Sequence, residues 1–193
     1  MKIFLIRHGQ TTGDVEDRYG GWYDDHLSPQ GILQAKKLAK ILKGHGIEIV
    51  YHSQFIRATE TALHIANALK IPMVSVDGLK ERDKYAMMSG MLKSEAKIKY
   101  PEEMLELARG HNSNVTESET YEHLKKRVAD AFGKILADKY HTVAIITHGG
   151  PIKSVMRDIM KIGEPENDIA DCGFLEIVYE KNKLILLNKD NLF

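Results

Sequence analysis

Short apolar runs alternate with longer amphipathic stretches along most of this sequence, and few folds accommodate that order. Runs of strand length cover residues 2–6, 47–51, 72–76, 141–147, 174–179 and 184–187. Apolar stripes at helical spacing cover residues 29–42, 54–69, 117–136 and 149–161. Strands that alternate with helices pair in parallel and leave both faces of the sheet to the helices. The order therefore predicts an α/β fold, a three-layer α/β/α sandwich with a mostly parallel sheet.

Local capping signals predict where the helices begin. Ser28 followed by Pro29 is a favourable N-cap with proline in the first turn, and Ser53 can cap the next helix. Thr116 with Glu119 has the spacing of a capping box in front of the long stripe that ends near residue 136. These signals predict helix starts at residues 29, 54 and 117.

One segment, residues 77–115, departs from the alternating pattern. It is charged, has no clean period and holds four of the eight methionines, so we interpret it as a lid inserted into the fold. Methionines can line a permissive pocket, although a small helical core is their commoner use. With 193 residues and neither a linker nor a repeat, the chain is expected to form a single domain over residues 1–193.

Composition narrows the range of partners and compartments. The 27 basic and 27 acidic side chains cancel, so no global field favours nucleic acid or a membrane surface as partner. No stretch reaches the roughly 18 apolar residues of a membrane span, and residues 1–7 lack the features of a signal peptide. The only cysteine, Cys172, cannot form an internal disulfide, which fits a reducing cytoplasm.

Two histidines follow predicted strands at the same edge of the sheet. Arg7-His8-Gly9 ends the first strand, and His148 follows a later one. Ligands of such sheets bind beyond the carboxyl ends of the strands. On a continuing strand Arg7 and His8 would point to opposite faces. Both can meet one ligand only if the chain bends there, and Gly9 permits such a bend.

These residue types suit a phosphate monoester. A neutral, oriented histidine nitrogen is a competent nucleophile, and a guanidinium binds oxyanions with two parallel hydrogen bonds. The transferred phosphoryl group spreads its charge over three oxygens, so positioning and fixed positive charge carry most of the catalysis. Arg57 lies near the start of a predicted helix that begins at the same edge as His8. A single arginine or histidine is more often an ordinary surface residue, but three such elements at successive strand ends favour a phosphate site.

Four motifs resemble those of the histidine phosphatase superfamily, which has the phosphoglycerate mutase-like fold. Residues 5–11, Leu-Ile-Arg-His-Gly-Gln-Thr, are similar to its nucleophile motif. Residues 53–61, Ser-Gln-Phe-Ile-Arg-Ala-Thr-Glu-Thr, are similar to its S-x-x-x-R-A-x-x-T motif. Residues 79–82, Leu-Lys-Glu-Arg, resemble its acid motif, and residues 147–150, Thr-His-Gly-Gly, its late histidine motif. The resemblance covers nearly the whole chain.

The resemblance implies five catalytic residues. His8 accepts the phosphoryl group, and Arg7, Arg57 and His148 hold its oxygens. Glu81 donates a proton to the leaving group, which an alkoxide requires because it leaves poorly on its own. The further substrate contacts that the resemblance implies are Thr11, Gly149 and Arg82.

The first motif departs from the family pattern at two positions. The family usually has Glu where this chain has Gln10 and Asn where it has Asp14. A carboxylate near the phosphate would repel it, so we expect Asp14 to turn away from the site or to be held by Arg18. The phosphate-binding role of that position is therefore left open.

The sequence leaves phosphatase and mutase as alternatives, with the phosphatase preferred. Residues 21–28, Gly-Trp-Tyr-Asp-Asp-His-Leu-Ser, resemble a segment of phosphoglycerate mutases that depend on 2,3-bisphosphoglycerate, but the pattern also occurs in phosphatases as a structural turn. The longer arginine-rich insertion of the mutases is not found here. A mutase should carry extra basic residues around the mouth of its site, and the candidates are Arg82, Lys84, Lys93 and Arg109.

A third alternative is a non-catalytic module that binds a phosphorylated ligand on the same fold. Such modules tend to lose a catalytic residue, and this chain retains all five. We expect no metal and no cofactor, unless the chain is a mutase that uses 2,3-bisphosphoglycerate. The expected partner is a small phosphorylated metabolite whose identity the sequence does not reveal, and a homodimer is left open.

Overall fold

A computed structural model of the chain describes residues 1–163 and 169–190, and it contains a six-stranded sheet in the order β3-β2-β4-β1-β5-β6. The strands are β1 (Lys2–Arg7), β2 (Ile49–His52), β3 (Met73–Ser75), β4 (Thr142–Thr147), β5 (Phe174–Glu180) and β6 (Lys183–Asp190). Strands β1 to β4 pair in parallel, and β5 and β6 add an antiparallel pair at one edge. The prediction of a mostly parallel sheet is confirmed.

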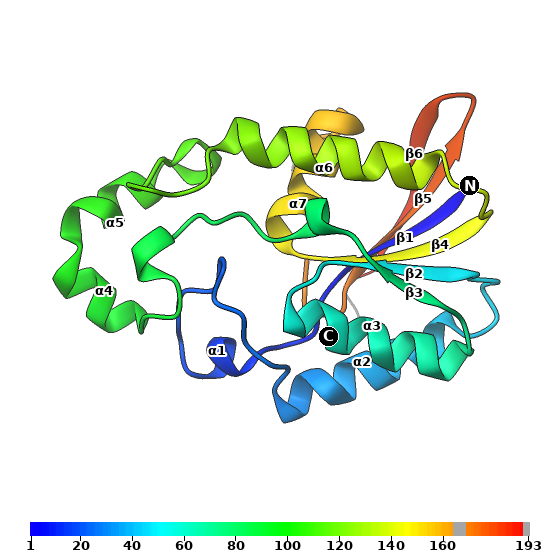
Figure 1. The fold of residues 1–193 in the computed structure, drawn as a ribbon, viewed down its shortest axis with the longest axis horizontal. Helices are drawn as coiled ribbons and strands as arrows, with labels where there is room; N and C mark the ends of the chain where they lie inside the picture. Colours follow the sequence, from blue (N-terminus) through cyan, green and yellow to red (C-terminus); the bar gives the residue numbers. More distant parts are fainter. Residues whose placement is uncertain (164–168, 191–193) are drawn as a thin grey trace.

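Helices cover both faces of this sheet (Figure 1). The helices are α1 (Thr12–Val15), α2 (Pro29–Leu42), α3 (Ile56–Leu69), α4 (Lys93–Lys99), α5 (Pro101–Leu107), α6 (Tyr121–Leu136) and α7 (Gly149–Ser154). A short π-helix, Val155–Ile159, continues α7, and 3-10 turns cover Asp77–Leu79, Ala86–Met88 and Gly110–Asn112. No helix in the described ranges is long and apolar enough to cross a membrane.

The alternation of side chains along β1 divides the core into two layers. Ile3 and Leu5 join the apolar cluster under α6 and α7, whereas Phe4 and Ile6 join the cluster under α2 and α3. All four side chains are 0–1% exposed. Because successive side chains of a strand point to opposite faces, a uniformly apolar strand is the expected sequence for a sheet covered on both sides. The three-layer α/β/α prediction is thus confirmed.

Helix starts agree with the sequence only in part. Ser28 caps α2 as predicted, with its hydroxyl accepting from the Gly31 N–H at 3.0 Å. The prediction of Ser53 as a cap is wrong, because α3 begins after Phe55 and the Ser53 hydroxyl bonds to His148. The capping box at Thr116 is also wrong, since Thr120 caps α6.

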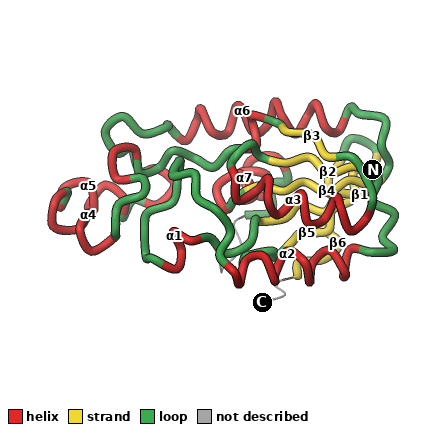
Figure 2. Tube along the Cα trace, turned by 60° about the horizontal axis from the view of Figure 1, so that its bottom comes forward, coloured by secondary structure: helices red, strands yellow, loops and turns green. Residues whose placement is uncertain are grey.

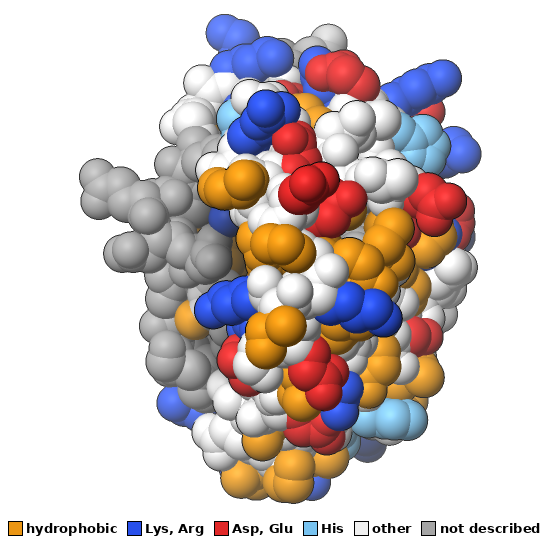
Figure 3. Space-filling view, turned by 90° about the vertical axis from the view of Figure 1, so that its left-hand side faces the viewer, with side chains coloured by type: hydrophobic (Ala, Val, Ile, Leu, Met, Phe, Trp, Pro, Cys, Tyr) orange, Lys and Arg blue, Asp and Glu red, His pale blue; other side chains and the backbone are white. Residues whose placement is uncertain are grey.

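The segment predicted as a lid extends beyond the carboxyl ends of the strands (Figures 1 and 2). It contains α4 and α5 and its own small apolar cluster, in which Met88, Ala96 and Val115 are 0–1% exposed. The methionines therefore serve mainly a small helical core. On the outer face of the molecule at this end, hydrophobic, basic and acidic side chains are intermixed (Figure 3).

Candidate active site

His8 lies directly after β1 and is only 6% exposed. Its Nδ1 atom lies 2.8 Å from the carbonyl oxygen of Gly9, an acceptor, so Nδ1 carries the proton and Nε2 keeps its lone pair. Burial, followed by the charges of Arg57 and Arg7, holds the pKa of His8 well below its usual value. The ring is therefore neutral at physiological pH, with a nucleophilic nitrogen facing the cavity.

Gly9 lies just after the end of β1, where a bend was predicted, and Arg7 and His8 line the same cavity. It does not adopt a positive φ angle. Instead, a Cβ atom at this position would lie 2.8 Å from the carbonyl oxygen of Gly31. Glycine is thus needed for the close approach of this loop to the start of α2, which fixes His8 next to the sheet edge.

Arg57, the second residue of α3, lies beside the nucleophile. Its Nε donates to Nε2 of His8 at 3.3 Å. Its terminal nitrogens donate to the carbonyl oxygens of Gly21 at 2.8 Å and Tyr23 at 2.6 Å, and Nη1 lies 3.2 Å from a carboxylate oxygen of Asp25. Because Arg57 is 3% exposed, these contacts fix one orientation of the guanidinium.

Asp25, which the sequence interpretation missed as a site residue, fixes this arrangement. Its second carboxylate oxygen accepts from the backbone N–H of Gly13, while the first pairs with Arg57. The preceding Asp24 accepts from the N–H of Ile56 at the start of α3. The segment over residues 21–28 therefore orients Arg57 and the start of α3, a role that a phosphatase and a mutase could both use.

Arg7 contributes a second guanidinium to the cavity. Its Nη1 donates to the carbonyl oxygen of Ile169 at 2.8 Å, and its Nη2 lies 3.3 Å from Asp171. Its Nε is buried and makes no hydrogen bond within the described part of the chain. Arg7 and His8 both line the same cavity, as the sequence predicted.

His148 completes the central group. Its ring centroid lies 4.9 Å from that of His8, and the residue is fully buried. Its Nε2 lies 2.8 Å from the Ser53 hydroxyl, whereas its buried Nδ1 makes no hydrogen bond within the described residues. When the Ser53 hydroxyl donates to Nε2, Nδ1 carries the proton. His148 lies beside His8 but is not itself among the described residues that line the cavity, so its contact with a phosphoryl group stays a prediction. Burial and the charge of Arg57 hold the pKa of His148 well below its usual value.

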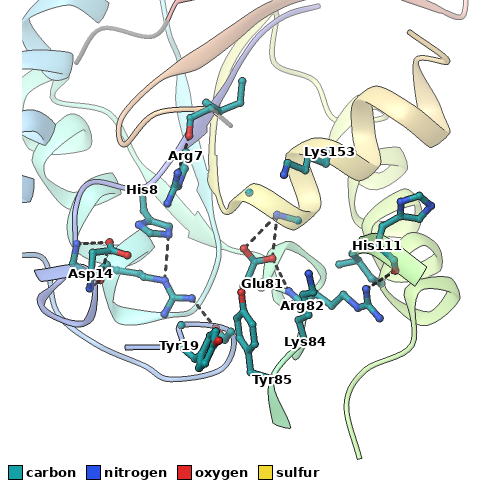
Figure 4. A pocket seen from close by; sticks show the side chains of 18 of the residues that line it. Arg7, His8, Asp14, Tyr19, Glu81, Arg82, Lys84, Tyr85, His111 and Lys153 are labelled. Carbon is teal, nitrogen blue, oxygen red and sulfur yellow. Dashed lines mark hydrogen bonds between the residues drawn. The ribbon is translucent and has the colours of Figure 1, made fainter. Parts of the chain in front are cut away.

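Glu81 lies across the cavity from His8 (Figure 4). Its carboxylate accepts from the backbone N–H groups of Arg82 at 2.7 Å and Gly150 at 3.1 Å. A Cβ atom at Gly150 would lie 2.3 Å from this carboxylate, so a side chain there would displace the Glu81 carboxylate from its present position. From α6, Arg127 donates to the Glu81 carbonyl oxygen at 2.9 Å and holds the loop.

The other predicted contacts have mixed outcomes. Thr11 and Gly149 line the cavity. Arg82 also lines it, but its guanidinium donates to the carbonyl oxygens of His111, Ser113 and Glu119 at 2.6–2.9 Å. Arg82 therefore anchors the lid, and its role as a substrate contact stays a prediction.

The two departures from the family motif are structural. Asp14 accepts from the N–H and the hydroxyl of Thr11, both at 2.9 Å, and closes a capping box at α1. The prediction that Arg18 holds Asp14 is wrong, because Arg18 pairs with Glu16. Gln10 accepts from the Ser28 hydroxyl at 2.7 Å and so joins the nucleophile loop to α2.

The cavity has a volume of about 540 Å³, which suits a small molecule. Among residues 1–163 and 169–190, no group of three or more His, Cys, Asp or Glu side chains could hold a metal ion. Fixed positive charge comes from arginines. The arrangement thus provides a neutral nucleophile, fixed donors around it and a carboxyl group on the opposite side.

The fold, with two histidines at neighbouring strand ends, defines an α/β enzyme of the phosphoglycerate mutase-like type. Residues 3–190 match the family described as "Histidine phosphatase superfamily (branch 1)", and the chain belongs to that family. The members that it matches include phosphatases and mutases.

Two relatives illustrate this range. Phosphoserine phosphatase 1 of Hydrogenobacter thermophilus is 28% identical over 97% of this chain and 92% of its own length. A 2,3-bisphosphoglycerate-dependent phosphoglycerate mutase of Staphylococcus saprophyticus is also 28% identical, over 86% of this chain and 87% of its own length. Sequence identity alone does not separate the two activities.

Solved structures confirm the fold. Bacillus stearothermophilus YhfR superposes with a TM-score of 0.88 at 23% identity, covering 96% of this chain and 94% of that one. A mycobacterial glucosyl-3-phosphoglycerate phosphatase superposes with a TM-score of 0.84 at 18% identity, covering 96% of both chains.

Proposed function

We propose that this chain is a metal-independent phosphatase that hydrolyses a small phosphomonoester through a phosphohistidine at His8. The observation that carries the proposal is the state of His8, a buried, neutral imidazole whose Nε2 faces Arg57 inside the cavity. A protonated histidine could not attack phosphorus. A histidine whose ring is free to rotate would seldom place its nitrogen in line with the bond from phosphorus to the leaving oxygen. The lowered pKa of His8 and its hydrogen bonds to Gly9 and Arg57 support both conditions.

The reaction follows from the positions of the side chains. Nε2 of His8 attacks phosphorus while the bond from phosphorus to the ester oxygen breaks. Arg57, Arg7 and Nδ1 of His148 surround the phosphoryl oxygens, where charge is spread in the transition state. Glu81, on the opposite side of the cavity, delivers a proton to the departing oxygen.

The second half of the reaction restores the enzyme. Water attacks phosphorus, the bond to Nε2 breaks, and the water's proton passes to the Glu81 carboxylate that the first step left behind. Inorganic phosphate is released. The arginines supply positive charge that a metal ion would provide elsewhere, and the neutral second histidine supplies a hydrogen-bond donor, so the proposal includes no metal and no cofactor.

The alternative is a phosphoglycerate mutase, supported by the mutase relatives. Its first half-reaction is the same, but a substrate hydroxyl in place of water accepts the phosphoryl group. The segment over residues 21–28 does not favour the mutase, because its carbonyl oxygens and carboxylates hold Arg57 and α3.

The test follows the fate of the phosphoryl group. The protein is incubated with a panel of phosphomonoesters, including 3-phosphoglycerate with and without 2,3-bisphosphoglycerate, in the presence of a chelator. The proposal expects inorganic phosphate from at least one monoester, with turnover lost in His8→Ala. Formation of 2-phosphoglycerate that depends on 2,3-bisphosphoglycerate, with little free phosphate, would identify a mutase instead.

The proposal also places the enzyme in a reducing cytoplasm. Its single cysteine, Cys172, is buried, and burial raises the pKa of the thiol, so this side chain is chemically inert. Formation of a homodimer stays a prediction.

A further inference from the structure

The turn Gly21-Trp22-Tyr23, called the bridging turn, contacts both sides of the candidate active site. The carbonyl oxygens of Gly21 and Tyr23 accept from the two terminal nitrogens of Arg57, at 2.8 and 2.6 Å. Between them, the indole Nε1 of Trp22 donates to the carbonyl oxygen of Glu81 at 2.9 Å. Glu81 lies across the cavity from the nucleophile that Arg57 contacts (Figure 4). The bridging turn therefore joins the arginine on one side to the carboxylic acid on the other.

The backbone of the bridging turn is suited to this contact. Gly21 has a φ angle of 60°, in the left-handed region that glycine adopts at little cost. A Cβ atom at Gly21 would also lie 3.0 Å from a ring atom of Tyr85. The N–H of Tyr23 donates to the carbonyl oxygen of Gly20 at 3.0 Å and closes the turn. The chain can thus reverse direction here with two carbonyl groups bonded to Arg57.

The ring of Trp22 is held by its neighbours, although the residue is 44% exposed. Its centroid lies 6.4 Å from that of Phe55, with the rings edge to face, and Nζ of Lys80 lies 4.8 Å from the Trp22 centroid. Phe55 in turn lies 5.0 Å from the guanidinium carbon of Arg57. Edge-to-face and cation–π contacts favour one orientation of the indole, and the hydrogen bond to Glu81 requires that its N–H be oriented.

The Glu81 backbone is held from two directions. Its carbonyl oxygen accepts from Nε1 of Trp22 and from Nη2 of Arg127, both at 2.9 Å, and a carbonyl oxygen has two lone pairs for two such bonds. The carboxylate of the same residue accepts from the N–H groups of Arg82 and Gly150. Loss of one of these donors should therefore displace the carboxyl group slightly and not release it.

We infer that Trp22 is a positioning residue that fixes the carboxyl group of Glu81 relative to Arg57 and His8. Trp22 is not among the described residues that line the cavity, so it acts through Glu81. The inference rests on the proposed phosphatase function and adds a residue to it. Proton transfer to the leaving oxygen is efficient only within hydrogen-bond distance, so a small displacement of the acid slows it. The contribution of Trp22 must then depend on how much the leaving group needs a proton.

The test removes the indole N–H and leaves the ring in place. Trp22 is the only tryptophan, so a tryptophan-requiring host supplied with benzothienylalanine changes this position alone and replaces the N–H with sulfur. Single-turnover rates are measured for an alkyl phosphate that the protein hydrolyses and for p-nitrophenyl phosphate. The matched control is Tyr179→Phe, which removes one hydrogen bond of 3.1 Å to Asn182, outside the described lining of the cavity.

The analogue should slow the alkyl phosphate by about 3- to 10-fold, the effect of one neutral hydrogen bond. It should slow p-nitrophenyl phosphate by less than about 2-fold, because p-nitrophenolate leaves unaided. Tyr179→Phe should change neither rate. In Glu81→Gln, which lacks the acid, the analogue should leave the ratio of the two rates unchanged. Equal losses on both substrates, no loss on either, or a ratio that still changes in Glu81→Gln would overturn the inference.

A second measurement separates this inference from the proposed function. The single indole N–H gives one signal in a nitrogen–proton NMR spectrum, and its exchange with solvent can be followed in the native protein and in His8→Ala without turnover. The hydrogen bond to Glu81 should slow that exchange by about 10-fold or more relative to a free indole. Exchange at the free rate, with His8-dependent hydrolysis intact, overturns the role of Trp22 alone. Hydrolysis that persists in His8→Ala overturns the phosphatase proposal, while slow exchange would still support the contact that holds Glu81.

Discussion

At the scale of single residues, the site depends on two buried histidines that stay neutral for the same physical reason. Both lie next to Arg57 and out of water, and both effects disfavour the imidazolium form. A neutral His8 can attack phosphorus at once. The cost falls on stability, because the unfolded chain binds protons at these positions that the folded chain does not.

The titration of the histidines should therefore differ by position. His8 and His148, with pKa values well below 6.5, should stay neutral as pH falls through 6.5. Exposed His26, whose pKa is raised by its hydrogen bond to Glu60, should become protonated above that pH. Two-dimensional NMR of the imidazole resonances measures all three. Titration of His8 near 6.5 would contradict the assignment of a neutral nucleophile.

The stability consequence has a definite sign. A histidine whose pKa is depressed by folding costs the folded state no stability above the unfolded value of 6.5. As pH falls from 6.5 towards the folded value, the unfolded chain binds protons that the folded chain does not, so the protein should lose stability over that range.

Arg57 should not tolerate replacement by lysine. A lysine ammonium cannot reach His8, the carbonyl oxygens of Gly21 and Tyr23, and Asp25 from one position. We expect Arg57→Lys to lower kcat by about 100-fold or more, the usual effect of losing one preorganised contact in the transition state. Steady-state kinetics measure kcat, and a melting curve shows whether the variant is folded. A near-native kcat in a folded variant would show that Arg57 does not take part in the reaction.

At the scale of elements, the loop over residues 80–84 joins the chemistry to the lid. Its first part presents the Glu81 carboxylate to the start of α7, and its second part carries Arg82 into the lid. Helix α6 holds the same loop, because Arg127 donates to the carbonyl oxygens of Gly78, Lys80 and Glu81. The loop over residues 80–84 therefore positions both the Glu81 carboxyl group and the lid.

The substitution Glu81→Gln tests directly whether Glu81 donates the proton to the leaving oxygen. An alkyl phosphate needs a proton on its leaving oxygen, whereas p-nitrophenolate leaves unaided. The substitution should slow the alkyl phosphate by roughly 100- to 10,000-fold and p-nitrophenyl phosphate much less. Single-turnover rates are required, so that chemistry at His8 limits both reactions. Equal losses on the two substrates would make Glu81 a positioning residue, with the nearby Asp83 as the next candidate acid.

Arg82→Met tests the anchoring role of this arginine. Loss of its three bonds to backbone carbonyls should expose the segment around residues 111–119, because each bond to a charged group contributes about 1.5–3 kcal/mol. Hydrogen exchange should rise there far more than in the sheet. Arg109→Met, which touches only Glu106 among the described ion pairs, serves as the control. Unchanged exchange with weaker substrate binding would instead support the original prediction of a substrate contact.

At the scale of the whole molecule, the sequence predicted what depends on local pattern and missed what depends on side chains meeting across the fold. The parallel sheet and its two covered faces followed from apolar periodicity, and the placement of His8, Arg7 and His148 followed from strand ends. The cap at Ser53 failed because its hydroxyl bonds to a histidine 95 residues away. No local signal reveals such a partner.

Other parts of the cavity lining show the same limit more strongly. Lys153 and Arg157 lie four residues apart near α7, where their sequence reads as an ordinary helix surface. Only the folded chain brings them to the cavity that Lys84 and His111 also line. The departures at Gln10 and Asp14 were visible in the sequence. That Asp14 closes the capping box of α1 and that Gln10 bonds to Ser28 became clear only from the folded chain.

The central claim is that the phosphoryl group passes through His8, and rapid quenching tests it most directly. The protein is mixed with substrate for milliseconds, denatured at alkaline pH, where phosphohistidine survives, and digested for mass spectrometry. The account predicts a single acid-labile phosphoryl group on the peptide that contains His8, formed and lost at rates compatible with turnover, and none in His8→Ala. Turnover without that phosphopeptide, together with undiminished activity in His8→Ala, would contradict it.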